Sequence, residues 1–300
     1  MPIPGKVVEL SELPALVPER ATVAFGGAWF ANHPMAAVRE LVRAGRTDIA
    51  GLALLGSIDV DLLVGAGVLT DLTFSMVTME AMGMAANFRR AGQSGELATT
   101  EVSAISLQLA LEAAGRGVPF LPLAGPEGSD LVPLHPEIYG RASTSFGDED
   151  VMVVRALRPD VAIVHASRCD ELGNAQFDGT YGQDPELARA AAKVIVTCEE
   201  IVSGDRIAET PERTRIPGFL VDAVIEAPFG AHPCSHVPQY AVDAWQLLEY
   251  QEAAADPEAF AGYLERLRGE TEAEYRARAV PGDRGAVLSA LVDAANVLER

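Results

Sequence analysis

The sequence predicts an α/β fold with an open, mostly parallel sheet flanked by helices. Short apolar runs of strand length, at 22–25, 49–55 and 158–166, are typical of strands buried on both faces of such a sheet. Segments with apolar residues at helical spacing follow several strands along the chain. The 300 residues, 49% of them hydrophobic, suffice for one large core with a helical tail.

The first β–α unit contains a glycine turn. Its strand, 22–25, ends at Gly26 and Gly27, and Pro34 opens a helix with apolar residues at helical spacing. Adjacent glycines permit positive φ, and without Cβ atoms they let a ligand approach backbone N–H groups. Such a turn can hold an anion or a developing oxyanion. The alternative is a plain β–α connection with no ligand.

The next segment continues the alternation of helices and strands. We expect a helix at 60–66, a strand at 72–77 and a helix at 79–90 whose methionines fill the core. Gly65 and Gly67 end the helix at 60–66 instead of opening one, so they do not form a dinucleotide-binding fingerprint.

Glu101 is the carboxylate that the pattern singles out. Thr99 or Thr100 is a good N-cap, which predicts that Glu101 lies in the first turn of the following helix. There it is either an exposed carboxylate stabilised by the helix dipole or a site carboxylate at the mouth of the sheet. In the second case, neighbouring amides would tune its pKa for acid–base work. The residues alone leave both interpretations open.

The second half of the chain begins with a polar segment. Residues 125–150 are rich in Gly, Pro, Ser and acidic residues and predict a long loop. The run 158–166 predicts a buried strand that contains His165, and 191–202 predicts a helix end and another strand. We interpret His165 as a buried strand histidine.

His232 and His236 flank a turn near the end of the α/β region. Pro233 prevents a regular His-x-x-x-His helix face, so the segment predicts a structural turn and no metal site. Beyond it lie amphipathic helices with Glu and Arg on their polar faces, which we expect to pack on the fold or contact another subunit: 240–254, 257–268 and 284–298.

Composition argues against several classes of partner. The net charge of −20 and the lack of clustered Lys and Arg argue against nucleic acid. No apolar run approaches the roughly 20 residues that span a bilayer, and the N-terminus lacks the regions of a signal peptide. Three unpatterned cysteines suit reduced thiols. We therefore expect a cytoplasmic protein that binds neither membranes nor nucleic acid.

Several short motifs occur in consistent order over about residues 20–235. The stretch 26–34 resembles a Gly-Gly-Phe-x-x-x-Gly-x-Pro signature, with Ala28 in place of Phe and Asn32 in place of Gly. Asn tolerates left-handed backbone geometry, so the second change is mild. The other matches are Glu101-Val102-Ser103, Gly-Val-Pro-Phe-Leu-Pro at 117–122, and the segments 160–174 and 217–233. Together they resemble the A subunit of the family I coenzyme A transferases, and most strongly that of glutaconate CoA-transferase.

The resemblance implies a CoA-transferase-type fold over 1–235 and a helical extension over 236–300. It implies an A subunit that works with a B subunit in a heteromer. A glutamate of the B subunit would form a glutamyl-CoA intermediate, moving CoA from an acyl-CoA to a carboxylic acid. A CoA thioester would be the substrate, with no permanently bound cofactor or metal. Glu101 would be catalytic, and the residues expected to bind substrate are Gly26, Gly27, Trp29, Phe30, Asn32 and Ser103.

Two alternatives remain open at this stage. The motifs also resemble the corresponding subunit of steroid-ring-opening CoA hydrolases, and in that case Glu101 would be the base of an acyl-CoA hydrolase. The other alternative is a non-catalytic scaffold subunit, which the departures at Ala28 and Asn32 favour.

Overall fold

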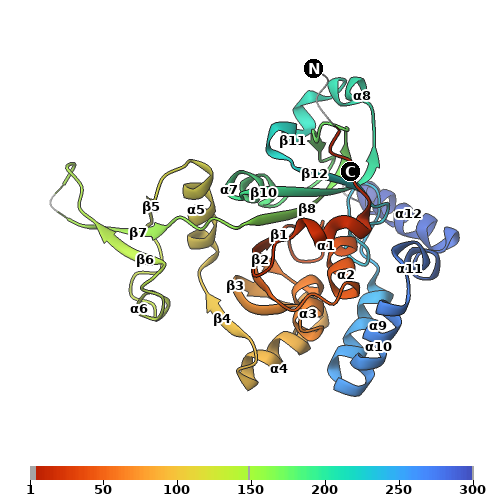
Figure 1. The fold of residues 1–300 in the computed structure, drawn as a ribbon, viewed down its shortest axis with the longest axis horizontal. Helices are drawn as coiled ribbons and strands as arrows, with labels where there is room; N and C mark the ends of the chain where they lie inside the picture. The colour runs from red at the N-terminus through yellow and green to blue at the C-terminus, as the bar shows by residue number, and fades with distance from the viewer. Residues whose placement is uncertain (1–4, 148, 299–300) are drawn as a thin grey trace.

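A central parallel sheet organises the computed structural model, which describes residues 5–147 and 149–298 (Figure 1). Its strands lie in the spatial order β4 (Ala98–Glu101), β3 (Leu69–Val77), β2 (Ile49–Gly56), β1 (Thr22–Phe25), β8 (Val161–Cys169), β10 (Lys193–Ile201) and β12 (Ala223–Glu226). Antiparallel strands β9 (Ala175–Gln176) and β11 (Thr214–Ile216) extend from β8. The predicted mostly parallel α/β sheet is therefore confirmed.

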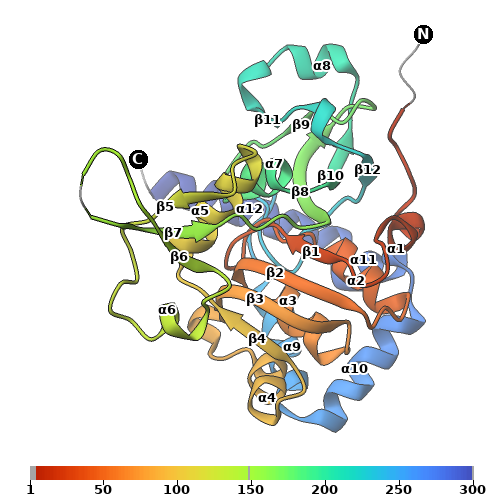
Figure 2. The same ribbon diagram turned by 60° about the vertical axis from the view of Figure 1, so that its left-hand side comes forward.

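The strand residues explain this order. Nearly every side chain of β8 is buried, as expected for a strand covered on both faces. In contrast, β4 is mostly exposed, which suits its place at the edge of the sheet (Figure 2).

Helices cover both faces of the sheet. One core joins the strands β1, β2 and β3 to α2 (Met35–Arg43) and α3 (Ile58–Gly65). On the other face, a second core joins the sheet to α5 (Ala104–Gly115) and α7 (Asp184–Ala190). A third core lies where β8, β10 and β12 meet β9 and β11. Smaller elements complete the layers: η1 (Leu10–Glu12), α1 (Leu13–Leu16), α8 (Gly204–Ala208), η3 (Pro211–Arg213) and η4 (Gly218–Leu220).

The expected C-terminal helical extension is present. It consists of α9 (Ala244–Ala255), α10 (Pro257–Gly269), α11 (Glu272–Ala279) and α12 (Gly282–Leu298); α11 was not predicted. These helices do not pack separately, because Leu247, Tyr250 and Phe260 belong to the same core as the first strands and helices. The buried Arg39 of α2 also pairs with Glu272 of α11. A domain boundary at residue 235 stays a prediction.

The prediction of an unstructured loop over 125–150 is wrong. This segment includes α6 (Leu131–Leu134) and β6 (Tyr139–Ala142). With β5 (Phe120–Pro122) and β7 (Val151–Arg155), β6 forms a small antiparallel sheet that projects from the main body (Figure 1). Buried Tyr139 and Val154 join the second core, and this packing outweighs the loop-like composition.

Two local predictions are also corrected. The expected helix at 79–90 is divided into η2 (Glu80–Met82) and α4 (Ala86–Ser94), because Gly83 between them has a φ of +111°. Glu101 is the last residue of β4 and not part of a helix. The cap of α5 is Ser103, whose Oγ accepts a hydrogen bond from Ser106 N–H at 3.2 Å.

Within the described residues, we find no helix with the length and hydropathy that crossing a bilayer requires.

Candidate active site

The order of the strands reverses beside β1. After β1 the chain adds β2, β3 and β4 on one side, whereas β8, β10 and β12 lie on the other. In open parallel sheets, ligands bind outside the carboxyl ends of the strands at such a point. The loop 26–34 leaves β1 at this edge and leads into α2, so it lies where the fold favours a site.

The glycine turn is held by hydrogen bonds within the chain. Gly26 N–H donates to the Ile163 carbonyl oxygen at 2.9 Å, and Gly27 N–H donates to Asp184 Oδ1 at 2.8 Å. A Cβ on Gly27, whose φ is +87°, would lie 2.6 Å from His33 N. The positive φ of Gly27 is as predicted, and the missing Cβ atoms permit close packing within the chain. However, both N–H groups already have acceptors, so an oxyanion would have to replace Asp184 or Ile163.

Asp184 is a buried carboxyl group that the sequence motifs did not identify. It begins α7 and has no exposed surface, and its Oδ2 has no hydrogen-bond partner among the described residues. Burial raises the pKa of Asp184 to about 7, although the bond from Gly27 opposes the rise. A carboxyl group that gains or loses a proton near neutral pH therefore lies directly against the glycine turn.

Trp29 projects from the loop, and its backbone is anchored on both sides. Its φ is +53° and its side chain is 50% exposed. Its N–H donates to the Leu55 carbonyl oxygen at 3.2 Å, and His33 Nε2 donates to its carbonyl oxygen at 2.6 Å. His33 Nδ1 lies 3.0 Å from Oδ2 of buried Asp59. The following Phe30 is half-buried and packs against the first core.

Asn32 has an internal role. It adopts the left-handed conformation expected for this position, with a φ of +59°, and is 3% exposed. Its Nδ2 donates to the Thr180 carbonyl oxygen, and its Oδ1 accepts from His236 Nδ1 at 2.7 Å. Because both amide atoms have partners within the chain, the side chain cross-links the loop to distant segments. Direct substrate binding by Asn32 stays a prediction.

His236 connects Asn32 to Ser167. The Ser167 Oγ lies 3.0 Å from His236 Nε2, so the order serine, histidine, asparagine resembles a nucleophile with its base and orienting group. All three residues are at most 3% exposed, however, so no substrate can reach the serine. Burial also lowers the pKa of His236 to about 3, with a contribution from nearby His165, and keeps the ring neutral. The trio stabilises the loop and is not a catalytic triad.

His165 is a buried strand histidine, as predicted. Its Nε2 lies 2.8 Å from Glu199 Oε1, an oxygen that also accepts from Tyr240 OH at 2.6 Å. The other oxygen of Glu199 accepts from Phe229 N–H at 2.7 Å. Burial is the largest single influence and opposes ionisation of Glu199, but His165, His236 and Tyr240 together outweigh it and lower the Glu199 pKa. These contacts hold the turn at Phe229 and Gly230, which precedes His232.

The two predicted turn histidines have partners within the chain. His232 contacts Tyr275 OH at 2.8 Å and Asp243 Oδ2 at 3.0 Å, whereas His236 Nδ1 donates to Asn32 Oδ1. Over residues 5–147 and 149–298 no group of three or more His, Cys, Asp or Glu side chains has an arrangement that could hold a metal ion.

Glu101 lies at the same edge of the sheet, with an exposed side chain. Strands β2 and β3 separate it from β1, a distance of about 14 Å at roughly 4.8 Å per strand. Ser103 shares a 2.6 Å hydrogen bond with Ser106 Oγ and caps α5. The predicted residues therefore form two groups on one edge: the loop 26–32 and the segment 101–103. A substrate that contacts both groups must extend across the ends of β2 and β3.

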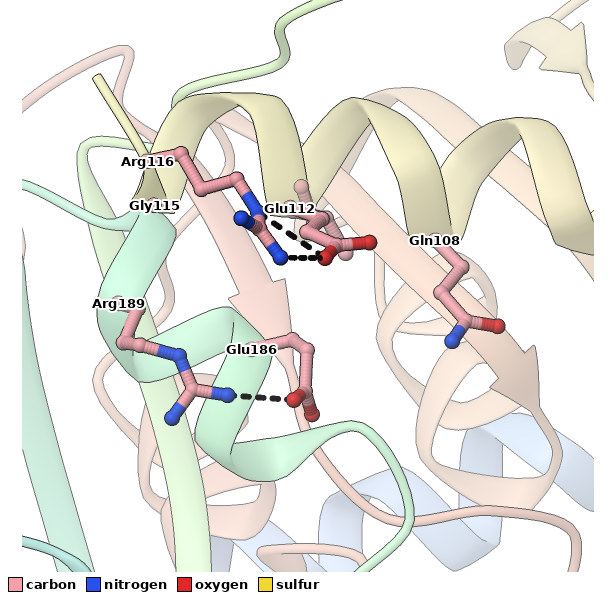
Figure 3. Close-up of a pocket in the computed structure, with 7 residues that line it drawn as sticks. Gln108, Glu112, Gly115, Arg116, Glu186 and Arg189 are labelled. Carbon is pink, nitrogen blue, oxygen red and sulfur yellow. Dashed lines mark hydrogen bonds and ion pairs between the residues drawn. The ribbon is translucent and has the colours of Figure 1, made fainter. Parts of the chain in front are cut away.

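A surface hollow of about 440 Å³ lies elsewhere, between α5 and α7 (Figure 3). Arg116 donates to Glu112 at 2.6 Å, and Arg189 pairs with Glu186. Because each arginine is paired with a glutamate on its own side of the hollow, the site offers little excess positive charge for an anion.

The coenzyme A transferase family model matches residues 9–227. The A subunit of glutaconate CoA-transferase from Acidaminococcus fermentans is 32% identical over 254 residues, covering 79% of each chain. The crystal structure of that species' glutaconate CoA-transferase superimposes with a TM-score of 0.88 at 29% identity, covering 94% of this chain and 95% of that one.

Two other relatives broaden the comparison. The cholesterol ring-cleaving hydrolase IpdA subunit of Mycobacterium tuberculosis is 28% identical and covers 92% of this chain and 97% of its own. An uncharacterized protein of Archaeoglobus fulgidus is 38% identical over 81% of this chain, which spans only 55% of that longer protein.

Proposed function

Because the chain belongs to the coenzyme A transferase family, in which it is an A subunit, we propose that it works with a B subunit as a CoA-transferase. A glutamate of the B subunit attacks the carbonyl carbon of an acyl-CoA and displaces the CoA thiolate, which leaves an acyl–glutamyl anhydride. The thiolate then attacks the glutamyl carbonyl, releasing the first carboxylic acid and forming glutamyl-CoA. A second carboxylate takes up CoA by the reverse sequence.

The superposition on the glutaconate CoA-transferase chain is the observation that carries this proposal. It covers 94% of this chain and 95% of that chain at a TM-score of 0.88. The carboxyl edge of the sheet adds support, because it presents the exposed Glu101 and the half-exposed Trp29.

We propose distinct roles for the two groups on this edge. Glu101 is the catalytic group that this chain contributes: it accepts or donates hydrogen bonds where the reacting carbonyl group lies. The indole of Trp29, with Phe30 behind it, contacts the apolar part of the acyl-CoA. Gly26 and Gly27 shape the loop, and Ser103 fixes the start of α5 behind Glu101.

The second candidate is hydrolysis of an acyl-CoA with Glu101 as the base that activates water. The similarity to the ring-cleaving hydrolase subunit favours this candidate, because the alignment covers 97% of that subunit. In such a reaction a glutamate of the B subunit would form no thioester, and Glu101 would take the proton from the attacking water.

The test pairs rate with covalent labelling. The chain is co-expressed with the product of the adjacent gene, the candidate B subunit, and the complex is incubated with a panel of acyl-CoAs, among them glutaryl-CoA, and acetate. Borohydride reduction and intact-mass measurement of both subunits then detect a glutamyl thioester. The variants are Glu101→Gln and, as a matched control, Glu96→Gln, an exposed glutamate beyond the other end of β4.

Transfer predicts a labelled B subunit in parent and variant, with Glu101→Gln slower and Glu96→Gln unchanged. Hydrolysis predicts no label and a rate loss of about 10² to 10⁴ for Glu101→Gln, the usual cost of a lost general base. Equal rates for the parent and Glu101→Gln in both assays would remove Glu101 from the site.

A further inference from the structure

Trp29 has a backbone conformation that needs support from its surroundings. Its φ of +53° is in the left-handed region, which is unfavourable for a residue with a Cβ atom. Such strain persists only where the surrounding structure imposes it, and it is concentrated at functional sites. Here the support comes from the bonds at the Trp29 N–H and carbonyl oxygen, so the half-exposed indole projects from a fixed backbone.

The support at the carbonyl oxygen comes from His33, which is 1% exposed. A carbonyl oxygen only accepts, so His33 Nε2 carries a proton. On the other side of the ring, Nδ1 faces Asp59 Oδ2 at 3.0 Å, and a ring nitrogen without a proton would repel a carboxylate there. Neither atom has a hydrogen-bond partner among the described residues, so a positive charge on the ring is what would make this completely buried 3.0 Å approach favourable.

A second proton, on His33 Nδ1, would supply that charge. Burial is the largest single influence and would lower the His33 pKa, but Asp59, the Trp29 carbonyl and Asp184 together outweigh it and raise the pKa above the ordinary 6.5. Burial correspondingly opposes ionisation of Asp59, yet the charge of His33 lowers its pKa. The other acidic group facing His33 is Asp184 at the start of α7, and the thiol of buried Cys234 lies near Asp59. A charged His33 would thus lie between Asp59 of α3, Asp184 of α7 and the loop 26–34.

We propose that His33 is a positioning residue for Trp29: as an imidazolium held by Asp59 it fixes the Trp29 carbonyl, and it releases the loop when it loses its proton. A neutral ring would set the Nδ1 lone pair against the Asp59 carboxylate in a buried contact, so the ring or the loop must move. The link to substrate rests on the proposed function, in which the Trp29 indole contacts acyl-CoA.

The first test needs no activity and uses the full chain. The sequence contains two tryptophans, and Trp245 is 76% exposed, so Trp245→Phe leaves Trp29 as the sole tryptophan at little structural cost. Fluorescence anisotropy and acrylamide quenching of Trp29 are then followed from about pH 5.5 to about pH 9.5, on both sides of the ordinary histidine pKa. We expect a transition above pH 6.5 in which anisotropy falls and quenching rises.

The variant His33→Gln in this background can still donate to the Trp29 carbonyl but cannot carry the charge. Both chains, with and without His33→Gln, also carry Asp184→Asn, which removes the other group beside the loop that titrates near pH 7. We expect higher quenching in His33→Gln at every pH and no transition. His135→Gln is the matched control, because His135 also lies beside a carboxylate, Glu137 at 3.3 Å, but far along the chain in the connection between α6 and β6. It should retain the transition. A transition that persists in His33→Gln, or Trp29 signals identical to those of the parent, would overturn the proposal.

A second measurement keeps the proposal testable if the His33→Gln chain does not fold. Carbon-13 NMR of labelled histidine rings in the unmodified chain reports the charge of each ring directly, and the double variant His33→Gln/Asp59→Asn, which leaves no buried charge unpaired, identifies the His33 signal. We expect the chemical shift of an imidazolium at pH 7. The shift of a neutral ring at that pH would overturn the proposal as well.

The last measurement connects the positioning of Trp29 by His33 to catalysis. In the complex with the B subunit, His33→Gln should raise KM for acyl-CoA about tenfold with a small change in kcat, the effect of one displaced aromatic contact. Trp29→Ala should raise KM similarly, and adding His33→Gln to it should have no further effect. An unchanged KM in a turning-over complex counts against the proposal. A complex that transfers no CoA contradicts the proposed function alone, since the fluorescence and NMR results stand apart from activity.

Discussion

Gly27 N–H donates a 2.8 Å hydrogen bond to Oδ1 of Asp184, a residue 157 positions later in the chain. This bond connects the loop after β1 to the start of α7, across the point where the strand order reverses. The carboxyl group is completely buried and has a pKa of about 7, so the stability of the connection depends on pH near neutrality.

Replacing Asp184 by Asn should change how stability varies with pH. In the folded parent, Asp184 keeps its proton up to about pH 7, whereas the unfolded chain loses it near 3.8. Between these values the folded state binds more protons, so the free energy of unfolding falls as pH rises, by on the order of 4 kcal/mol in total. Asn keeps an oxygen for Gly27 and has no proton to lose. Its stability relative to the parent should therefore increase from about pH 4 to about pH 7 and then level off.

Urea unfolding at several pH values checks this prediction. Asp205→Asn, an exposed aspartate in α8, is the matched control, and its stability should follow that of the parent. Parallel curves for Asp184→Asn and the parent would show that Asp184 is ionised in the folded chain and would contradict the prediction.

Gly27→Ala should be much more destabilising than an equivalent change elsewhere. A Cβ at this position would lie 2.6 Å from His33 N and 2.8 Å from the Ala31 carbonyl oxygen, both backbone atoms that cannot move away cheaply. Gly45 also has a positive φ, +65°, but nothing lies within 4 Å of its added Cβ. We expect about 1 kcal/mol for Gly45→Ala, the cost of the backbone conformation, and about 3 kcal/mol or more for Gly27→Ala. Equal losses in chemical denaturation would show that the loop adapts.

Arg39→Met should test the connection between the α/β region and the C-terminal helices. The Arg39 guanidinium, 1% exposed, pairs with Glu272 and lies 3.8 Å from the centre of the Tyr275 ring. Removing one partner of a buried pair costs about 3–5 kcal/mol when the other charge is left uncompensated; here Arg43 still contacts Glu272 at 3.0 Å, so we expect a loss of about 3 kcal/mol. The same change at Arg116, whose pair with Glu112 is exposed on α5, should cost less than about 1 kcal/mol. Thermal unfolding of both variants checks the contrast, and a loss at Arg39 as small as that at Arg116 would mean that Arg43 alone compensates Glu272.

Local patterns predicted much of the fold. The apolar runs at 22–25, 49–55 and 158–166 became β1, β2 and β8, because a strand covered on both faces excludes polar residues. Predictions that depended on packing were less accurate: β6 has a loop-like composition and is a strand only because it pairs with β7 and packs on the second core. The helix at 79–90 was divided by Gly83, whose positive φ no periodicity reveals.

The sequence by itself determined the kind of fold, the family, the glycine turn and the left-handed position of Asn32, because each follows from residues close together in the chain. Only the tertiary structure decided what the turn contacts. Asp184, Asp59 and His236 reach it from distant segments, and no spacing in the sequence relates them to Gly27, His33 or Asn32. Their protonation was likewise beyond the sequence, since burial and neighbouring charge set a pKa, and both exist only once the strands have brought these groups together.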